Sequence, residues 1–291
     1  MRNYARPTWL IFLCGVAVLG APAGGSDEFT RAMQCYRAQA FGEAREIFNR
    51  IAGREPGKVE IDFHLGRLAL WFDEGELALT HLERALRTGP VEARIHNALG
   101  DAYGHAAQNA HLLAKLGWAR KCRAAYERAV ELDPANPAYR WSLVGYFCVA
   151  PRLAGGGLEK ARAQAGEIAR LDPMEGRIAR ATLALAEQNW EAAFAEFDPV
   201  LREAPDNFLA LYQVGRCAAL SGRQIERGIA ALRRCLELTA PAGENVPTFA
   251  CVHFRLGNLL EKKGDPAAAE EYAAARRAHP DFRPQKITLK M

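Results

Sequence analysis

The sequence predicts an all-α protein built from a row of stacked helical hairpins. A similar sequence motif recurs at a spacing near 34 residues, and most copies end in a proline, as at Pro56 and Pro90. Within each copy apolar residues recur at spacings of 3, 4 and 7, which places them on one face of a helix. No stretch of useful length alternates apolar and polar residues as a half-buried strand would. These observations favour a repeat of helices over any sheet fold.

Each copy of this motif is expected to form the second helix of one hairpin. An alanine stands twelve residues before the closing proline, a large apolar residue eight before it, and a compact apolar residue five before it. The first two copies are Ala44, Phe48, Ile51, Pro56 and Ala78, Leu82, Ala85, Pro90. Later copies end at Pro134, Pro173, Pro205 and Pro280, and a weaker one ends at Ala240. Because the residue before a proline disfavours helical conformation, each closing proline marks a helix end.

A second sequence motif precedes most copies of the first one and is expected to form the first helix of the hairpin. It holds a small residue after an apolar one, at Leu65-Gly66, Leu99-Gly100, Val214-Gly215 and Leu256-Gly257. Small residues let two antiparallel helices approach closely. One hairpin cannot bury its apolar face alone, so neighbours must stack. Seven units result, near residues 27–56, 57–90, 91–134, 135–173, 174–205, 206–241 and 247–280.

A period of about 34 residues with a Leu-Gly pair, a later alanine and a closing proline resembles the tetratricopeptide repeat (TPR) family. The resemblance covers roughly residues 27–281, and several copies keep the same register. It implies a right-handed superhelical solenoid over residues 24–281, with 282–291 as a C-terminal tail. It also implies a scaffold that binds protein or peptide partners, although this fold serves many settings.

Residues 1–23 are predicted to form a secretory signal peptide. Two arginines within the first six residues precede an apolar run from Trp9 to Leu19, and Ala21-Pro22-Ala23 supplies the small residues of a cleavage site. The run is shorter than an ordinary membrane span. We therefore expect a periplasmic or secreted protein. An uncleaved anchor and lipidation at Cys14 are the alternatives.

Composition narrows the classes of partner. Charged residues make up 25% and hydrophobic residues 49% of the chain, which is ordinary for a soluble globular protein. The formal net charge of +4 becomes 4 − 2 = +2 without the two arginines of the predicted signal peptide. Such a balance gives no reason to expect a nucleic-acid partner.

The cysteines allow two interpretations. Apart from Cys14, six remain, and an even number in an exported protein is compatible with disulfides. Cys122 and Cys235, however, occupy positions where other units place alanine or another compact apolar residue. We favour buried thiols for that reason. The sequence has no Cys-x-x-Cys, which speaks against a structural zinc site or a thioredoxin-like redox site.

A metal-dependent hydrolase is the third-ranked hypothesis. His96, His105 and His111 lie near Asp101 in one unit, and such groups can hold a metal ion. Their spacings of 9 and 6 residues do not place the three histidines on one helical face. Motifs for metalloproteases, serine hydrolases and phosphate loops are missing from the sequence. We therefore expect no enzyme, no metal, no cofactor and no small-molecule substrate.

The family resemblance also suggests a binding surface. In the family the first helices line a concave groove, and the residue three before each small position points into it. The small positions here are Ala32, Gly66, Gly100, Val144, Ala181, Gly215 and Gly257. The residues three before them are Phe29, Phe63, Asn97, Trp141, Ile178, Tyr212 and Phe254. One residue beyond the small position, Arg67, Asp101 and Arg216 add polar groups to that face.

Two interpretations of this row remain open. As a peptide groove it uses aromatic anchors, and the predicted site is Phe63, Arg67, Asp101, Trp141, Tyr212, Arg216 and Phe254. The alternative is ordinary packing between helices. The family's use of lysine and asparagine to clamp a C-terminal carboxylate is put in doubt by the aromatic residues.

Insertions offer further candidates for docking. The repeat is lengthened at 104–118 and at 150–157, and insertions on one edge of a solenoid tend to mark a binding face. A structural, self-associating role in cell-envelope assembly is therefore the second functional hypothesis.

Overall fold

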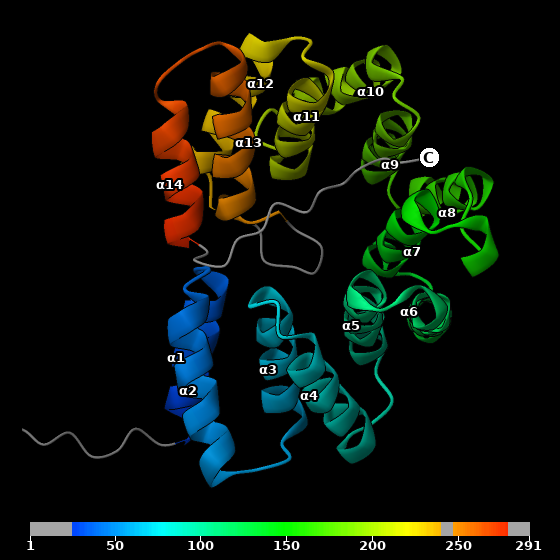
Figure 1. The fold of residues 1–291 in the computed structure, drawn as a ribbon, viewed down its shortest axis with the longest axis vertical. Helices are drawn as coiled ribbons and strands as arrows, with labels where there is room; N and C mark the ends of the chain where they lie inside the picture. The colour runs from blue at the N-terminus through cyan, green and yellow to red at the C-terminus, as the bar shows by residue number, and fades with distance from the viewer. Residues whose placement is uncertain (1–24, 240–246, 279–291) are drawn as a thin grey trace, which may run out of the picture.

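The structure, a computed structural model, describes residues 25–239 and 247–278. This part of the chain is all α-helical apart from one short 3-10 helix, and it contains no strand (Figure 1). The all-α prediction is confirmed. The predicted signal peptide, the closing Pro280 and the tail at 282–291 lie outside the described residues.

Fourteen α-helices and one 3-10 helix, η1, follow one another in the described residues. Their bounds are α1 Gly25–Arg37, α2 Phe41–Arg54, α3 Val59–Trp71, α4 Gly75–Thr88, α5 Ala93–Asn109, α6 Leu112–Leu132, α7 Pro137–Val149, η1 Arg152–Ala154, α8 Leu158–Leu171, α9 Pro173–Ala186, α10 Trp190–Glu203, α11 Phe208–Ser221, α12 Ile225–Glu237, α13 Phe249–Lys262 and α14 Ala268–Ala278. Asn136, Asp172, Asn189 and Asn207 cap the first turns of α7, α9, α10 and α11 with their side-chain oxygens.

The helices pair into hairpins that stack in chain order. Each odd-numbered helix packs most extensively against the even-numbered helix that follows it, and each hairpin then packs against the next. The hairpins form an arc in which α5, α7, α9 and α11 lie on the inner side, with α6, α8 and α10 outside (Figure 1). We call the side lined by the odd-numbered helices the inner face. This is a helical repeat solenoid.

Residues of the two sequence motifs contact one another inside each of four hairpins. A Cβ added to Gly100 would lie 2.3 Å from the Tyr126 ring, and one added to Gly215 would lie 2.3 Å from Leu232. Gly66 with Leu82 and Gly257 with Tyr272 show the same contact. The glycine of the first helix therefore receives the large side chain of the second, which no residue with a Cβ allows at this separation.

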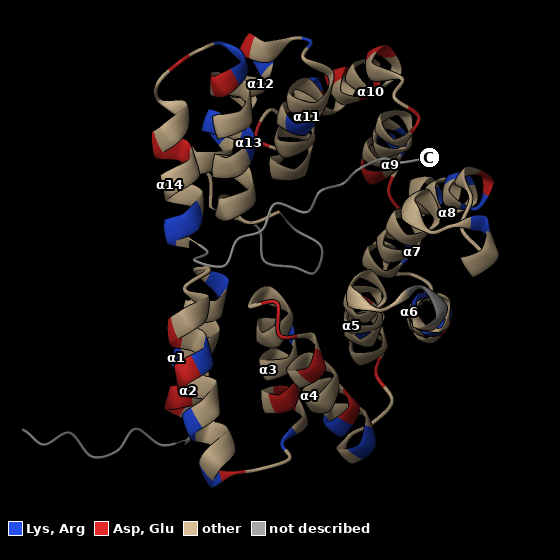
Figure 2. Ribbon diagram, in the orientation of Figure 1, with Lys and Arg blue, Asp and Glu red and all other residues tan. Residues whose placement is uncertain are grey.

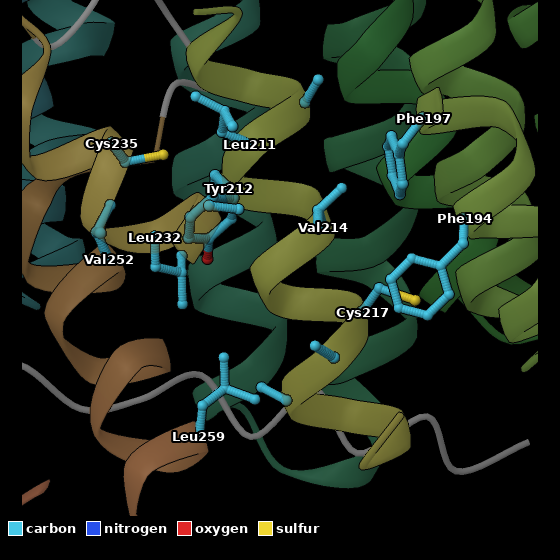
Figure 3. Close-up of a cluster of buried hydrophobic side chains, with 14 of the residues drawn as sticks. Phe194, Phe197, Leu211, Tyr212, Val214, Cys217, Leu232, Cys235, Val252 and Leu259 are labelled. Carbon is cyan, nitrogen blue, oxygen red and sulfur yellow. The ribbon is translucent and has the colours of Figure 1, made fainter. Parts of the chain in front are cut away.

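The hydrophobic core runs along the solenoid as a series of clusters. Four clusters of buried residues follow the chain from the first hairpin to the last. Figure 3 shows part of the last one, where side chains from α11, α12 and α13 meet between the helices. Trp141 packs against both this cluster and the preceding one. Each cluster joins neighbouring hairpins, as nearest-neighbour stacking requires.

The two insertions alter the third and fourth hairpins. With 17 and 21 residues, α5 and α6 are the longest helices of the described chain. The second insertion contains η1 and a turn in which Gly155 has a φ of 89°, a conformation that glycine tolerates best. The Tyr146 hydroxyl ties this turn to the core by donating to the Ala154 carbonyl at 2.7 Å.

The first and last hairpins approach one another. Gln39, in the turn between α1 and α2, accepts a hydrogen bond of 3.0 Å from the backbone N–H of Phe249 in the first turn of α13. These partners are 210 positions apart in the sequence, so the hairpins between them return the chain close to its starting hairpin (Figure 1). Among the described residues, no helix is both long and apolar enough to cross a bilayer.

Replacing the glycine at the helix contact tests the repeat packing. Gly100→Ala forces the Tyr126 ring away from α5, and Tyr126 also donates a hydrogen bond of 2.7 Å to Asp101. We expect the free energy of unfolding to fall by about 1 to 3 kcal/mol. Gly117→Ala is the control, since a Cβ there meets nothing within 4 Å. It should stabilise α6 by about 0.5 to 1 kcal/mol. Urea titrations in which both variants unfold alike would contradict this account of the contact.

A buried histidine makes the first two hairpins sensitive to pH. His64 is buried among aromatic rings of the first two hairpins. Its ring stacks on that of Phe48, with centroids 5.1 Å apart, and the Tyr36 ring lies at the same centroid distance. Its Nδ1 is buried without a hydrogen-bond partner. Burial lowers the pKa of His64 to about 4, while Glu60 opposes this change.

The folded protein therefore takes up the His64 proton at lower pH than the unfolded chain, whose histidine pKa is about 6.5. Stability falls as the pH drops from about 6.5 to about 4, by about 3 kcal/mol in total. The His64→Phe variant has no proton to bind at this position, and its unfolding free energy should lose less over the same interval. Parallel urea titrations at pH 7 and pH 4.5 measure the difference. Equal losses in both proteins would refute the assignment to His64.

Candidate binding surface on the inner helices

Basic and acidic residues are interspersed along the helices of the first three hairpins (Figure 2). On the inner face, charged side chains of these hairpins are paired with one another. Arg67 of α3 donates to Asp101 of α5 at 2.7 Å, and the Tyr126 hydroxyl donates to the same carboxylate. Arg94 binds Glu60 through both terminal nitrogens. The predicted polar residues Arg67 and Asp101 are thus brought together, but their charges already neutralise each other.

The aromatic row divides between core and surface. Phe63 is buried in the core cluster of the second and third hairpins, and the Arg94 guanidinium covers its ring at 4.8 Å. Asn97 and Ile178, at the equivalent positions of α5 and α9, are also buried. These positions contribute mainly to packing, as the alternative interpretation of the row expected.

Of the four aromatic residues in the predicted site, two keep part of their surface. Trp141 of α7 is half-buried, and its indole N–H donates to Glu175 of α9 at 3.1 Å. Phe254 of α13 is also half-buried, beside the Tyr272 ring at 5.8 Å. They remain the predicted aromatic residues with surface available to a partner.

Tyr212 lies between these two residues in chain order and is nearly covered. Figure 3 places it within the cluster formed by α11, α12 and α13, near Leu232 and Val252. Burial raises the pKa of its phenol, while Arg255 opposes the rise through its charge and a hydrogen bond. Tyr212 therefore joins the hydrophobic core to a polar region on the inner face.

That polar region contains two arginines. Arg216 of α11 donates to Gln213 at 3.2 Å, and its Nε is buried with no hydrogen-bond partner. Burial lowers the pKa of Arg216, and the charge of Arg255 lowers it further. Arg255 donates to Asn258 at 3.5 Å. Neither arginine forms an ion pair within the described residues.

Sequence reasoning missed Arg255. The rule applied was to take the residue three before each small position, whereas Arg255 stands two before Gly257. Gln213 occupies the corresponding place before Gly215 and contacts Arg216. Including the residue two before each small position would have added Arg255 to the candidates, although not its proximity to Arg216.

The candidate metal ligands do not come together. His105 contacts Asp73 at 2.6 Å, whereas Asp101 is held by Arg67 and Tyr126. His111 is exposed at the start of α6. Within the residues that the structure describes, no group of three or more His, Cys, Asp or Glu side chains could hold a metal ion. The constellation behind the hydrolase hypothesis is therefore not assembled.

The cysteines in residues 25–239 and 247–278 are free thiols. Cys122, Cys217 and Cys235 are buried, and burial raises the pKa of each thiol to about 12. A thiol that remains protonated at neutral pH is a poor nucleophile. These residues act as small apolar side chains in the core.

Two shallow hollows lie away from the predicted site. They occupy about 320 and 330 Å³ between α8, α9 and α10, over a floor that includes Ala184 and Ala192. The charged residues at their rims are paired, as in the contact of Arg180 with Glu196 at 3.0 Å. None of the predicted site residues lines either hollow.

Comparison with known proteins identifies the repeat. A family model described as Tetratricopeptide repeat matches residues 107–136. The crystal structure of a thermophilic TPR protein from Thermus thermophilus aligns with a TM-score of 0.56 and 18% identity, over 73% of this chain and 100% of that chain. Residues 107–136 thus match the tetratricopeptide repeat family, and the chain shares the fold of solved TPR proteins. Recognition of the family from the repeat spacing is confirmed.

Other solved structures share the fold of this chain. A tetratricopeptide repeat protein from Parabacteroides merdae ATCC 43184 aligns with a TM-score of 0.52 and 14% identity, over 91% of this chain and 96% of that one. The APC/C hetero-tetramer Cut9-Hcn1 gives a TM-score of 0.53 at 14% identity, over 89% of this chain and 48% of the matched chain, so this chain spans about half of its length. No curated protein matches the sequence at a significant level. At these identities the likeness establishes the fold alone.

Proposed function

We propose that this protein is a non-enzymatic scaffold that binds an extended segment of a partner protein along the inner face of its odd-numbered helices. The observation that carries the proposal is the pair of partly exposed aromatic residues, Trp141 and Phe254, on that face. Aromatic side chains with an apolar body and remaining exposed surface are frequent anchors at interfaces. The TPR fold itself is a protein-interaction scaffold.

Two further observations support this proposal. A chain of the APC/C hetero-tetramer Cut9-Hcn1 shares the fold, so a solenoid of this type is part of a protein complex there. In this chain the described residues assemble no metal cluster, and the Asp101 carboxylate of the hydrolase hypothesis is engaged by Arg67 and Tyr126. Binding accounts for the exposed aromatic residues without requiring chemistry.

We propose further that the protein is exported. The support is the N-terminal pattern of two arginines, an apolar run from Trp9 to Leu19 and Ala21-Pro22-Ala23. In an exported protein the partner is an envelope or extracellular protein. The free thiols of Cys122, Cys217 and Cys235 are compatible with that location, because their burial protects them from oxidation.

Substitution of the exposed aromatic residues tests the binding proposal. Peptides selected from a random-sequence display library on the purified chain serve as the probe. Trp141→Ala and Phe254→Ala should each weaken binding of the selected peptides by about 2 kcal/mol, roughly thirtyfold, because they remove an anchor. The melting temperature should change little, since both side chains are half-buried.

Trp190→Ala is the matched control, because Trp190 is an equally half-buried tryptophan at the start of α10 on the outer side. It should leave peptide affinity unchanged. A library that yields no binding peptide, or affinity that falls as much for the control as for Trp141→Ala, would rule out the inner-face proposal.

N-terminal sequencing tests export. When the chain is expressed from Met1 in a bacterium with a periplasm, we expect periplasmic protein that starts near Gly24. Replacing Ala23 by Asp removes a small residue from the cleavage site, so the precursor should accumulate uncleaved. Protein that begins at Met1 and stays in the cytoplasm would contradict the proposal.

A further inference from the structure

The inner-face arginines fall into two groups that differ in their partners. Arg67 and Arg94, in the second and third hairpins, each bind a carboxylate of a neighbouring hairpin. Among the described residues, Arg216 and Arg255, in the sixth and seventh hairpins, form hydrogen bonds to the amides of Gln213 and Asn258 and to the Tyr212 hydroxyl, and no ion pair. The charges of the inner-face arginines are therefore neutralised by carboxylates in the second and third hairpins but not in the sixth and seventh.

No carboxylate of the neighbouring helices is available to these two arginines. The segments of α7 and α11 contain no aspartate or glutamate. Glu175 of α9 accepts the Trp141 indole N–H, and Glu261 of α13 accepts the Tyr272 hydroxyl. Within the residues that the structure describes, the charges of Arg216 and Arg255 are therefore not balanced by a carboxylate in direct contact.

Keeping two like charges together on a partly buried surface costs stability. The Arg216 Nε is a buried donor with no partner, and leaving such a group unsatisfied is destabilising. Arg255 adds repulsion, which contributes to the lowered pKa of Arg216. An anion that accepts from both guanidinium groups would offset the burial and the repulsion together, and arginine's planar fork suits a carboxylate.

We propose that Arg216 and Arg255 bind the carboxylate of an aspartate or glutamate side chain in the partner segment, with Tyr212 and Gln213 beside it. This inference rests on the proposed function and specifies the partner's chemistry. The carboxylate supplies the negative charge that neither arginine receives from an ion pair within the described residues.

The surroundings favour an acidic side chain inside a segment over a chain terminus. On one side of Arg216, beyond α9, lies α7 (Figure 1), where Trp141 and Cys148 are seven residues apart and therefore share a face. On the other side lies α13, where the Arg255 guanidinium is 5.5 Å from the centre of the Phe254 ring. A segment that contacts both aromatic residues continues past the arginines in each direction. Its sequence should contain an acidic residue between two apolar ones.

The first arm of the test measures stability without any ligand. Arg216→Met keeps the length of the side chain and removes a charge that has no counter-ion, so the melting temperature should rise or stay unchanged. Arg233→Gln on α12, an exposed arginine away from the inner face, is the control and should have no effect. A clear fall in melting temperature for Arg216→Met would show that the arginine is structural, and would overturn the proposal.

The second arm uses peptides from a random-sequence display library selected on the purified chain. We expect selected sequences to share an acidic residue flanked by apolar ones. Replacing that residue by its amide should weaken binding at least tenfold to the original chain, and less than twofold to Arg216→Gln or Arg255→Gln. This difference is the coupling of a double-mutant cycle. Arg233→Gln should behave as the original chain does.

Amidation of the peptide C-terminus separates the two sources of a carboxylate. Unchanged affinity on amidation supports the acidic side chain, whereas a loss that disappears in Arg216→Gln assigns the site to a chain terminus and overturns the proposal. Selected peptides that bind through Trp141 but lack an acidic residue would overturn this inference and leave the proposed function standing. If no peptide is selected, both fail.

Discussion

The contact between a small residue on one helix and a large side chain on the next is the constraint on which the rest of the structure depends. Tyr126 lies where a Cβ on Gly100 would be, and Leu232 does the same at Gly215. Because the helices of a hairpin can come this close, their apolar faces are covered and the next hairpin finds a surface of defined shape. The arc of the solenoid is the sum of these repeated local contacts.

The same packing decides which residues of the inner helices remain accessible. Phe63, Trp141 and Phe254 occupy equivalent positions in the repeat, yet Phe63 is buried and the other two are not. Phe63 belongs to the core cluster of its own and the next hairpin, where Arg94 also covers the ring. Repeat position therefore indicates the helix face but does not determine exposure, which depends on the neighbours that each hairpin meets.

Electrostatics divides the inner face in a similar way. In the first three hairpins, successive units place opposite charges against each other, as Arg67 and Asp101 do across a spacing of 34 residues. In the last two hairpins, Arg216 and Arg255 face amides and a tyrosine instead. The inner face therefore differs in charge between its two ends, and this difference would give a segment bound as we propose a preferred direction.

The sequence by itself determined the family, the all-α class and the helix faces, because proline spacing and apolar periodicity are local properties that survive in every copy. It also pointed to Trp141 and Arg216. Tertiary structure alone decided that Tyr212 is covered and that Arg255 joins Arg216, since both depend on how closely α11 and α13 pack. The hydrogen bond between Gln39 and Phe249 is likewise invisible in the sequence, because it results from the accumulated rotation of all the hairpins between them.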